Sequence, residues 1–109
     1  MKYYIYKITL KTDPTVFYIG STNSISSRRS SHKKYYKCKT SKKYWTCLYV
    51  FIRASGGWES FDMDIIHEGM LSDMTKDEEK KEIKKIEQTY IDNLKPLLNT
   101  INATKNKLT

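Results

Sequence analysis

The chain has 109 residues and a formal net charge of +8, from 20 Lys and Arg against 12 Asp and Glu. This length suits one domain and excludes two, and we expect that domain to span residues 1–100, with a flexible C-terminal tail at 101–109. Tyrosines and a lysine interrupt residues 1–10, so we expect neither a signal peptide nor a membrane span there. Cys38 and Cys47 form no C-x-x-C pair, which favours reduced thiols and an intracellular location.

A β-hairpin is predicted near the start of the chain. Aromatic and branched side chains alternate with polar ones over residues 3–10, which is the period of a half-buried strand. Residues 16–20 predict a second, antiparallel strand, which would set Tyr6 near Tyr18. Gly20 ends that strand, and its missing side chain would let a phosphate or a metal approach the backbone beside Tyr18. An ordinary strand-end glycine is the alternative.

A helix is predicted directly after this hairpin, beginning at Ile25. Asn23 or Ser24 can cap its N-terminus, because a short polar side chain accepts a hydrogen bond from the first backbone N–H groups. Arg28 and His32 lie four residues apart and therefore share one face of this helix. A guanidinium and an imidazole on one face can converge on one phosphate.

The stretch from residue 28 to 43 carries eight cations and no Asp or Glu. Tyrosines follow these cations closely, a composition that suits a polyanion whose counterions are released on binding. A solvated, lysine-rich face is the alternative interpretation. On the first interpretation the partner is nucleic acid, contacted by seven of these side chains: Arg29, Lys33, Lys34, Lys37, Lys39, Lys42 and Lys43.

Two more elements are predicted in the middle of the chain. Residues 44–54 place apolar side chains at helical spacing, and Gly56 and Gly57 stop the helix. We expect this helix to be mainly core. Residues 61–66 alternate apolar and acidic side chains, which predicts a third strand at the end of the sheet.

The last predicted element is a long charged helix. Thr75 and Glu78 form a capping box that opens it, and it continues to about Leu94. Glu87 stands inside its apolar stripe, whereas the earlier glutamates of this helix face outward. A carboxylate at the edge of a core costs desolvation energy unless it meets a cation, a hydrogen-bond donor or a metal. A partly exposed glutamate at the margin of the stripe is the alternative.

Taken in chain order, these residues resemble the motifs of the GIY-YIG endonuclease superfamily. The matched positions span residues 2–99, almost the whole chain, and are Tyr4-Ile5-Tyr6, Tyr18-Ile19-Gly20, Arg28, His32, Glu87 and Asn99. The resemblance implies a small α/β (α+β) domain in which helices flank a three-stranded antiparallel sheet. It also implies hydrolysis of DNA phosphodiester bonds with Mg²⁺, for which Mn²⁺ can substitute. Tyr4 stands where the family has the first glycine of its name, a change that a strand tolerates.

The resemblance further implies a role for each catalytic side chain. Glu87 would be the single protein ligand of the metal, and Arg28 would contact the scissile phosphate. Tyr18 would be the general base, its pKa lowered from about 10 by a nearby cation. Tyr6 would hydrogen-bond in the same site, and the two tyrosines could exchange roles. His32 would hold a phosphate or the hydrogen-bond network of the attacking water.

Two structural positions and the partners complete what the resemblance implies. Gly20 would lie beside the site, and Asn99 would brace the last helix against it. The DNA would be duplex or branched, bound by a monomer or by a DNA-induced dimer, and no membrane would be involved. No appended DNA-binding module follows Asn99, so sequence specificity stays open.

Two other hypotheses compete with cleavage. A nucleic-acid-binding module could keep the fold without cutting, supported by the basic, aromatic-rich segment 28–45 and opposed by the intact set of catalytic candidates. A zinc protein would have to use Cys38, Cys47, His32 and His67, whose spacing fits no usual zinc site. An endonuclease is therefore the main hypothesis.

Overall fold

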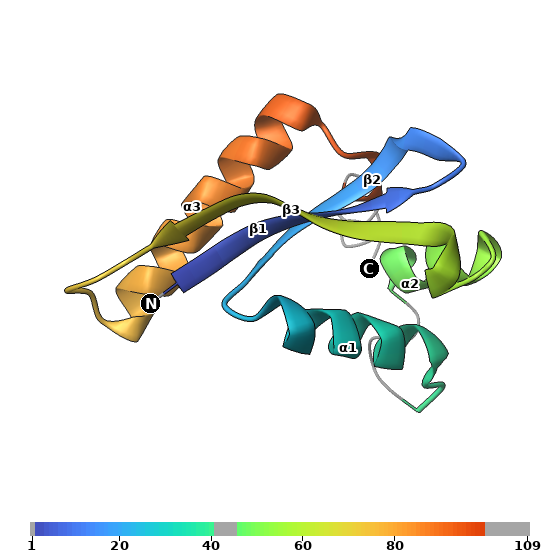
Figure 1. Cartoon of the computed structure of the whole chain (residues 1–109), viewed down its shortest axis with the longest axis horizontal. Coiled ribbons are helices and arrows are strands. Elements are labelled where there is room, and N and C mark those ends of the chain that lie inside the picture. The colour runs from blue at the N-terminus through green and yellow to red at the C-terminus, as the bar shows by residue number, and fades with distance from the viewer. Residues whose placement is uncertain (1, 41–45, 100–109) are drawn as a thin grey trace.

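The structure is a computed structural model that describes residues 2–40 and 46–99. The elements in chain order are β1 (Lys2–Leu10), β2 (Asp13–Thr22), α1 (Ile25–Lys37), α2 (Cys47–Ala54), the 3-10 helix η1 (Trp58–Ser60), β3 (Phe61–Met70) and α3 (Lys76–Leu94). Helices flank a three-stranded antiparallel sheet, which confirms the predicted fold class (Figure 1). The tail at 101–109 lies outside the described residues.

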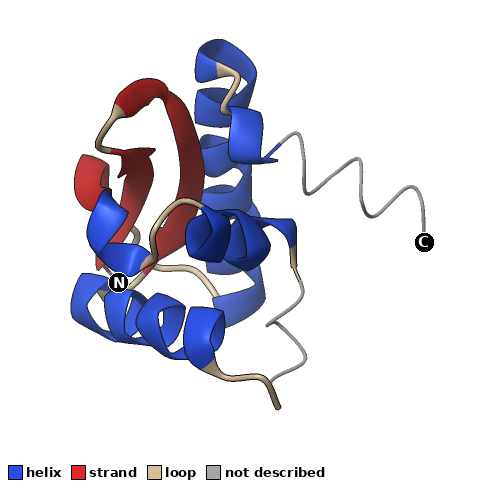
Figure 2. Ribbon diagram, turned by 90° about the vertical axis from the view of Figure 1, so that its right-hand side faces the viewer, coloured by secondary structure: helices blue, strands red, loops and turns tan. Residues whose placement is uncertain are grey.

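The central strand β1 separates two cores. The strand order is β2-β1-β3, and successive side chains of β1 point to opposite faces of the sheet. Tyr6 and Ile8 therefore pack on the face of α2, whereas Tyr3 and Ile5 pack on the face of α3. Figure 1 shows α3 and α1 on opposite sides of the sheet, and Figure 2 shows the helices around the strands from a second direction.

The core on the α1 and α2 side supports the candidate site. Leu48 and Ile52 enter it from α2, as their helical spacing predicted, and Trp58 enters it from η1. Leu98, which follows α3 in the chain, is also buried there with 1% of its surface exposed. Each fully buried side chain of this size contributes about 1.5–3 kcal/mol to folding. This core fixes the backbone under the candidate site.

A β-bulge in β3 changes which face its side chains occupy. Tyr6 pairs with Ile65, but the preceding residue Ile5 pairs with His67, so Ile66 is the extra residue. Paired residues share a face of the sheet, and the bulge therefore turns His67 toward α3. The predicted alternation of burial holds as far as Asp64, but Ile65, which was predicted on the apolar side, is 47% exposed. Beyond the bulge the strand continues to Met70.

The predicted caps account for where α1 and α3 begin. Ser24 caps α1, because its side chain accepts a hydrogen bond from the backbone N–H of Ser27. Thr75 and Glu78 form both hydrogen bonds of the capping box that opens α3. Leu94, predicted in the buried stripe of α3, is 46% exposed because the helix ends there. Within the described residues, no helix is both long and apolar enough to cross a bilayer.

Candidate active site

His32 lies at the centre of the candidate site, between two tyrosines. Its Nε2 is 2.9 Å from the hydroxyl of Tyr6, and its Nδ1 is 2.8 Å from the hydroxyl of Tyr49. The imidazole is 4% exposed and stacks on Trp58, with ring centroids 5.8 Å apart and planes 15° apart. These contacts join β1, α1, α2 and η1, so they fix the ring orientation of His32.

Gly20 faces Tyr6 across the β1–β2 ladder. A Cβ atom at this position would overlap the hydroxyl and the ring of Tyr6, which crosses the glycine to reach His32. Close packing against the tyrosine therefore explains this glycine, and neither of the two explanations offered by the sequence is needed. Any larger side chain would displace the Tyr6 hydroxyl.

Arg28 on α1 and Glu87 on α3 both act electrostatically on the two tyrosines, Tyr6 on β1 and Tyr18 on β2. Burial raises the pKa of Tyr18, the Glu87 carboxylate raises it further, and Arg28 opposes both effects. Burial likewise raises the pKa of Tyr6, with a further increase from Tyr18 and opposition from Arg28. Side chains far apart in the sequence thus form one cluster.

The direction of these shifts differs from the sequence-based expectation. A cation was expected to lower the pKa of Tyr18, yet burial and the neighbouring carboxylate outweigh the effect of Arg28. Tyr18 is therefore a neutral phenol at neutral pH, with burial as the main cause of its raised pKa. Positive charge placed against that carboxylate would remove the second cause of the shift.

Glu87 lies at the margin of the α3 stripe and is half-buried. Ser21 donates a hydrogen bond of 2.6 Å to its Oε1 from the β2 strand. The sequence left open whether a cation, a hydrogen-bond donor or a metal contacts this carboxylate, and the structure shows a hydrogen-bond donor. Ser21 was not among the predicted residues, although the two-residue period of β2 places it on the α3 face, opposite to Tyr18 and Gly20.

The residues present fit a hydrated divalent cation better than a fully protein-ligated one. The described residues contain no group of three or more His, Cys, Asp or Glu side chains that could hold a metal. Glu87 offers oxygen, the ligand that Mg²⁺ prefers, and a single carboxylate leaves room for the waters that Mg²⁺ keeps. Zinc is not supported, because both nitrogens of His32 and both nitrogens of His67 contact tyrosine hydroxyls.

Asn99 closes the outer edge of β2. Its Oδ1 accepts a hydrogen bond of 2.8 Å from the backbone N–H of Ile19, and its Nδ2 donates one of 3.0 Å to the carbonyl of the same residue. The Asn99 amide thus satisfies the backbone N–H and carbonyl of Ile19 on the edge strand β2, as a neighbouring strand would. Ile19 lies between Tyr18 and Gly20, so Asn99 holds the backbone of the site in place.

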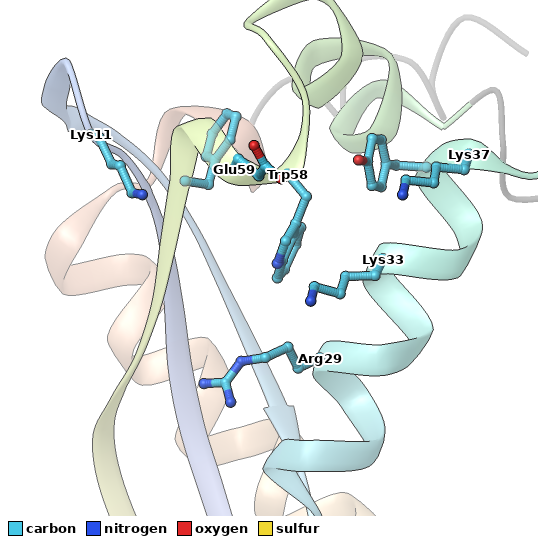
Figure 3. A pocket seen from close by; sticks show the side chains of 8 residues that line it. Lys11, Arg29, Lys33, Lys37, Trp58 and Glu59 are labelled. Atoms are coloured by element: carbon cyan, nitrogen blue, oxygen red, sulfur yellow. The ribbon is translucent and has the colours of Figure 1, made fainter.

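The basic side chains predicted to contact nucleic acid separate into two groups on or after α1. Arg29, Lys33 and Lys37 line a cavity together with Trp58 and other residues (Figure 3). Two other cations are exposed but do not line that cavity, namely Lys34 and Lys39. The last two predicted cations lie outside the described residues, namely Lys42 and Lys43.

Sequence reasoning missed Tyr49 and Trp58 as neighbours of the site. The sequence patterns singled out neither residue, because their contacts with His32 join α1 to two other elements, α2 and η1. Neither residue belongs to a local motif that points to His32. The helical spacing of residues 44–54 indicated a core helix but not which hydroxyl would reach the imidazole.

Comparison with known families agrees with this geometry. Residues 2–102 match the model of the GIY-YIG catalytic domain, which covers nearly the whole chain. Searches of curated proteins and of solved structures gave no significant match. The length of the family match, together with the convergence of Tyr6, Tyr18, Arg28 and Glu87, leads to one conclusion. The chain belongs to the GIY-YIG family of catalytic domains.

Proposed function

We propose that this protein is a divalent-metal-dependent DNA endonuclease. A nuclease-type function follows from its family, whose members generally depend on a divalent metal. The observation that carries the proposal is the electrostatic coupling of Tyr18, Arg28 and Glu87, which come from three different elements. These are the three chemical types that phosphodiester hydrolysis needs: a proton acceptor, a cation for the phosphate and a metal ligand.

Glu87 would hold the metal, and we propose Mg²⁺, with Mn²⁺ as a substitute. The Ser21 hydroxyl orients the carboxylate by its 2.6 Å hydrogen bond. When bound, a divalent ion supplies charge stabilisation at the phosphate and increases the acidity of water in its shell. Burial is the main cause that raises the pKa of Tyr18, and a cation held by Glu87 would offset only the second cause, the carboxylate charge.

Arg28 would bind the scissile phosphate. Its guanidinium is half-buried on α1 and presents a planar set of N–H donors that matches phosphate oxygens. The charge on those oxygens grows during attack, so a cation fixed in advance stabilises the transition state more than the bound substrate. The loss of such a donor costs about a hundredfold to a thousandfold in rate.

Tyr18 is the better candidate for the general base of the two tyrosines. Tyr6 is 2% exposed and its hydroxyl is engaged with His32, which suits a positioning role. Tyr18 is half-buried, and Glu87 is the second cause of its raised pKa after burial, whereas Glu87 is the smallest cause for Tyr6. Tyr18 would first give up its phenol proton to solvent, and its phenolate oxygen would then take a proton from water as the water oxygen bonds to phosphorus. The bond to the leaving oxygen then breaks, and solvent protonates that oxygen.

The test is cleavage of supercoiled plasmid DNA. We expect nicking or cutting with Mg²⁺ or Mn²⁺ and none with EDTA. Glu87→Gln should lower the rate about a thousandfold, because it removes the metal ligand that supplies several kcal/mol of stabilisation, and should preserve DNA binding. Glu82→Gln, a half-buried glutamate on the same helix, is the matched control and should cleave normally.

Two outcomes would contradict the proposal. Full activity of Glu87→Gln would remove the metal assignment. Binding of DNA without cleavage under any divalent metal, in a folded protein, would instead favour the binding module that keeps this fold without cutting.

A further inference from the structure

A basic cavity of about 350 Å³ lies beside the proposed site. Its walls come from α1, from η1 with the start of β3, and from Lys11 in the turn between β1 and β2 (Figure 3). Four cations line it against one carboxylate, that of Glu59: Lys11, Arg29, Lys33 and Lys37. This volume lies at the lower end of the range of small-ligand pockets.

The three cations from α1 form one stripe without acidic partners. Arg29, Lys33 and Lys37 follow at four-residue steps, which places them on the same face of the helix. None of the three forms an ion pair with a carboxylate anywhere in residues 2–40 and 46–99. Arg29 donates one long hydrogen bond of 3.4 Å, to the carbonyl of Met63. Like charges gathered in a concave space repel one another, and an anion bound among them would relieve that repulsion.

Aromatic side chains form the rest of the cavity wall. Trp58 and Phe61 are 8% and 5% exposed, so they form its apolar floor. Tyr36 is half-buried, and the Lys37 Nζ lies 5.6 Å from its ring centroid. Cations beside an accessible aromatic ring are the combination that binds an unstacked base and its phosphate. A site for the backbone of a duplex alone would need no aromatic wall.

The cavity shares a wall with the candidate active site. Trp58 lines the cavity and also stacks on His32, which in turn contacts Tyr6. On α1, Arg28 belongs to the catalytic cluster and its neighbour Arg29 lines the cavity. The shared Trp58 wall is the contact that connects the cavity with the candidate active site.

We propose that this cavity binds one unpaired nucleotide next to the scissile phosphate. Arg29 and Lys33 hold its phosphate, and its base packs against Tyr36. The preferred substrate is then DNA with a single-stranded segment at a fork or flap, since a base of a continuous duplex must first be unstacked and unpaired. This inference rests on the proposed function in one respect: it assumes that the phosphate next to the bound nucleotide is the one that is cut.

The experiment measures binding in EDTA, where cleavage does not contribute. A Trp45→Phe background leaves Trp58 as the single tryptophan and therefore as a fluorescent reporter of the cavity. Forked DNA and continuous duplex of equal length are titrated into the protein. We expect the fork to bind about tenfold more tightly than the duplex, the value of one stacked base, and to change the Trp58 emission.

Matched variants separate the cavity from the basic surface in general. Lys33→Gln and Tyr36→Leu should each bring the affinities for fork and duplex close together. Lys34→Gln removes the same charge from the next residue of α1, outside the cavity, and should weaken both affinities equally. Arg29→Gln gives a second test of the cavity if Tyr36→Leu fails to fold, which circular dichroism detects.

The outcomes distinguish this inference from the proposed function. Equal binding of fork and duplex by the unmodified chain, or equal effects of Lys33→Gln and Lys34→Gln on their ratio, would overturn the cavity proposal even in an active nuclease. Preference for the fork in a protein that never cleaves would support the cavity and refute only the nuclease function.

Discussion

Two tyrosine–histidine–tyrosine bridges lie on opposite faces of the same sheet. On the α1 side, His32 joins the hydroxyls of Tyr6 and Tyr49 at 2.9 and 2.8 Å. On the α3 side, His67 joins the hydroxyls of Tyr3 and Tyr90, both at 3.1 Å. We call these the α1-side bridge and the α3-side bridge. Each joins the central strand β1 to a helix through an imidazole.

Each bridge also depends on a glycine. Gly20 on β2 pairs with Tyr6, and Gly69 on β3 pairs with Tyr3. At either glycine a Cβ atom would overlap the ring and hydroxyl of the paired tyrosine. A glycine paired with a bridge tyrosine thus occurs on both faces of the sheet, once in β2 and once in β3.

The surroundings of the two bridges differ. Arg28, Glu87 and Tyr18 lie within electrostatic reach of the α1-side bridge. The α3-side bridge packs among apolar side chains, including Ile83. Hydrogen-bond geometry alone does not tell the two apart, because their patterns are alike. We propose chemistry for the bridge that contains the family-motif residues Tyr6 and His32 and lies near Arg28, and packing for the other one.

The largest expected effect that separates the bridges comes from the guanidinium. Arg28→Ala should lower the cleavage rate by about a hundredfold or more, because it removes a fixed cation from the developing charge at the phosphate. Tyr90→Phe is the counterpart in the α3-side bridge, because it removes the hydroxyl that contacts His67, and it should leave the rate unchanged. Single-turnover cleavage of a labelled oligonucleotide measures both variants.

Arg28→Lys refines that test. A lysine keeps the charge but loses the planar pair of donors, so we expect an intermediate rate. A normal rate for Arg28→Ala, in a variant that binds DNA as the parent does, would contradict the assignment of chemistry to the α1-side bridge.

The two glycines give the next largest effect. Gly20→Ala and Gly69→Ala should each lower the free energy of unfolding by about 1–3 kcal/mol, because the added methyl group overpacks a tyrosine ring. Only Gly20→Ala should also slow cleavage, since it displaces Tyr6 from His32. Urea unfolding and the cleavage assay are run on the same two proteins. Equal loss of cleavage in both variants would mean that the rate follows overall stability and not the α1-side bridge.

Much of this molecule could be predicted from local pattern. The cap at Ser24 and the capping box at Thr75 depend on residues a few positions apart, and both occur as expected. β1 is a strand as predicted, but it is buried on both faces and not on one, because helices cover both sides of the sheet. The family motifs placed Tyr18 and Glu87 in one site. The structure brings these two side chains within electrostatic reach, although 69 positions separate them in the sequence.

What could not be predicted depends on contacts between distant elements. The bulge at Ile66 follows from how β3 pairs with β1, and it alone places His67 toward α3 instead of in a metal site. Ser21 reaches Glu87 across 66 positions, and Tyr49 reaches His32 from another helix. Such contacts depend on side-chain rotamers and on distances in the folded structure, and the spacing of residues along the sequence specifies neither.

The smallest effect concerns the alkaline stability of the α1-side bridge. Burial is the main cause that raises the pKa of both Tyr6 and Tyr49, and the neighbouring Tyr18 raises both further. Above about pH 10 the unfolded chain releases phenol protons that the folded chain still holds. The contribution of these tyrosines to the free energy of unfolding should therefore be complete below about pH 10. It should decrease as the pH rises further, by about 1.4 kcal/mol per pH unit for each such tyrosine.

Tyr6→Phe isolates this contribution, because it removes one of the protons that the folded chain retains. We expect the stability of this variant to fall less steeply between about pH 9 and 11 than that of the parent, as measured by urea unfolding. Tyr3→Phe removes a hydroxyl from the α3-side bridge and shows what the loss of one hydrogen bond costs without touching the α1 side. An unchanged slope in Tyr6→Phe would mean that the phenol is accessible to ionisation. The tight packing of Tyr6 between Gly20 and His32 would then fail as the explanation for the glycine.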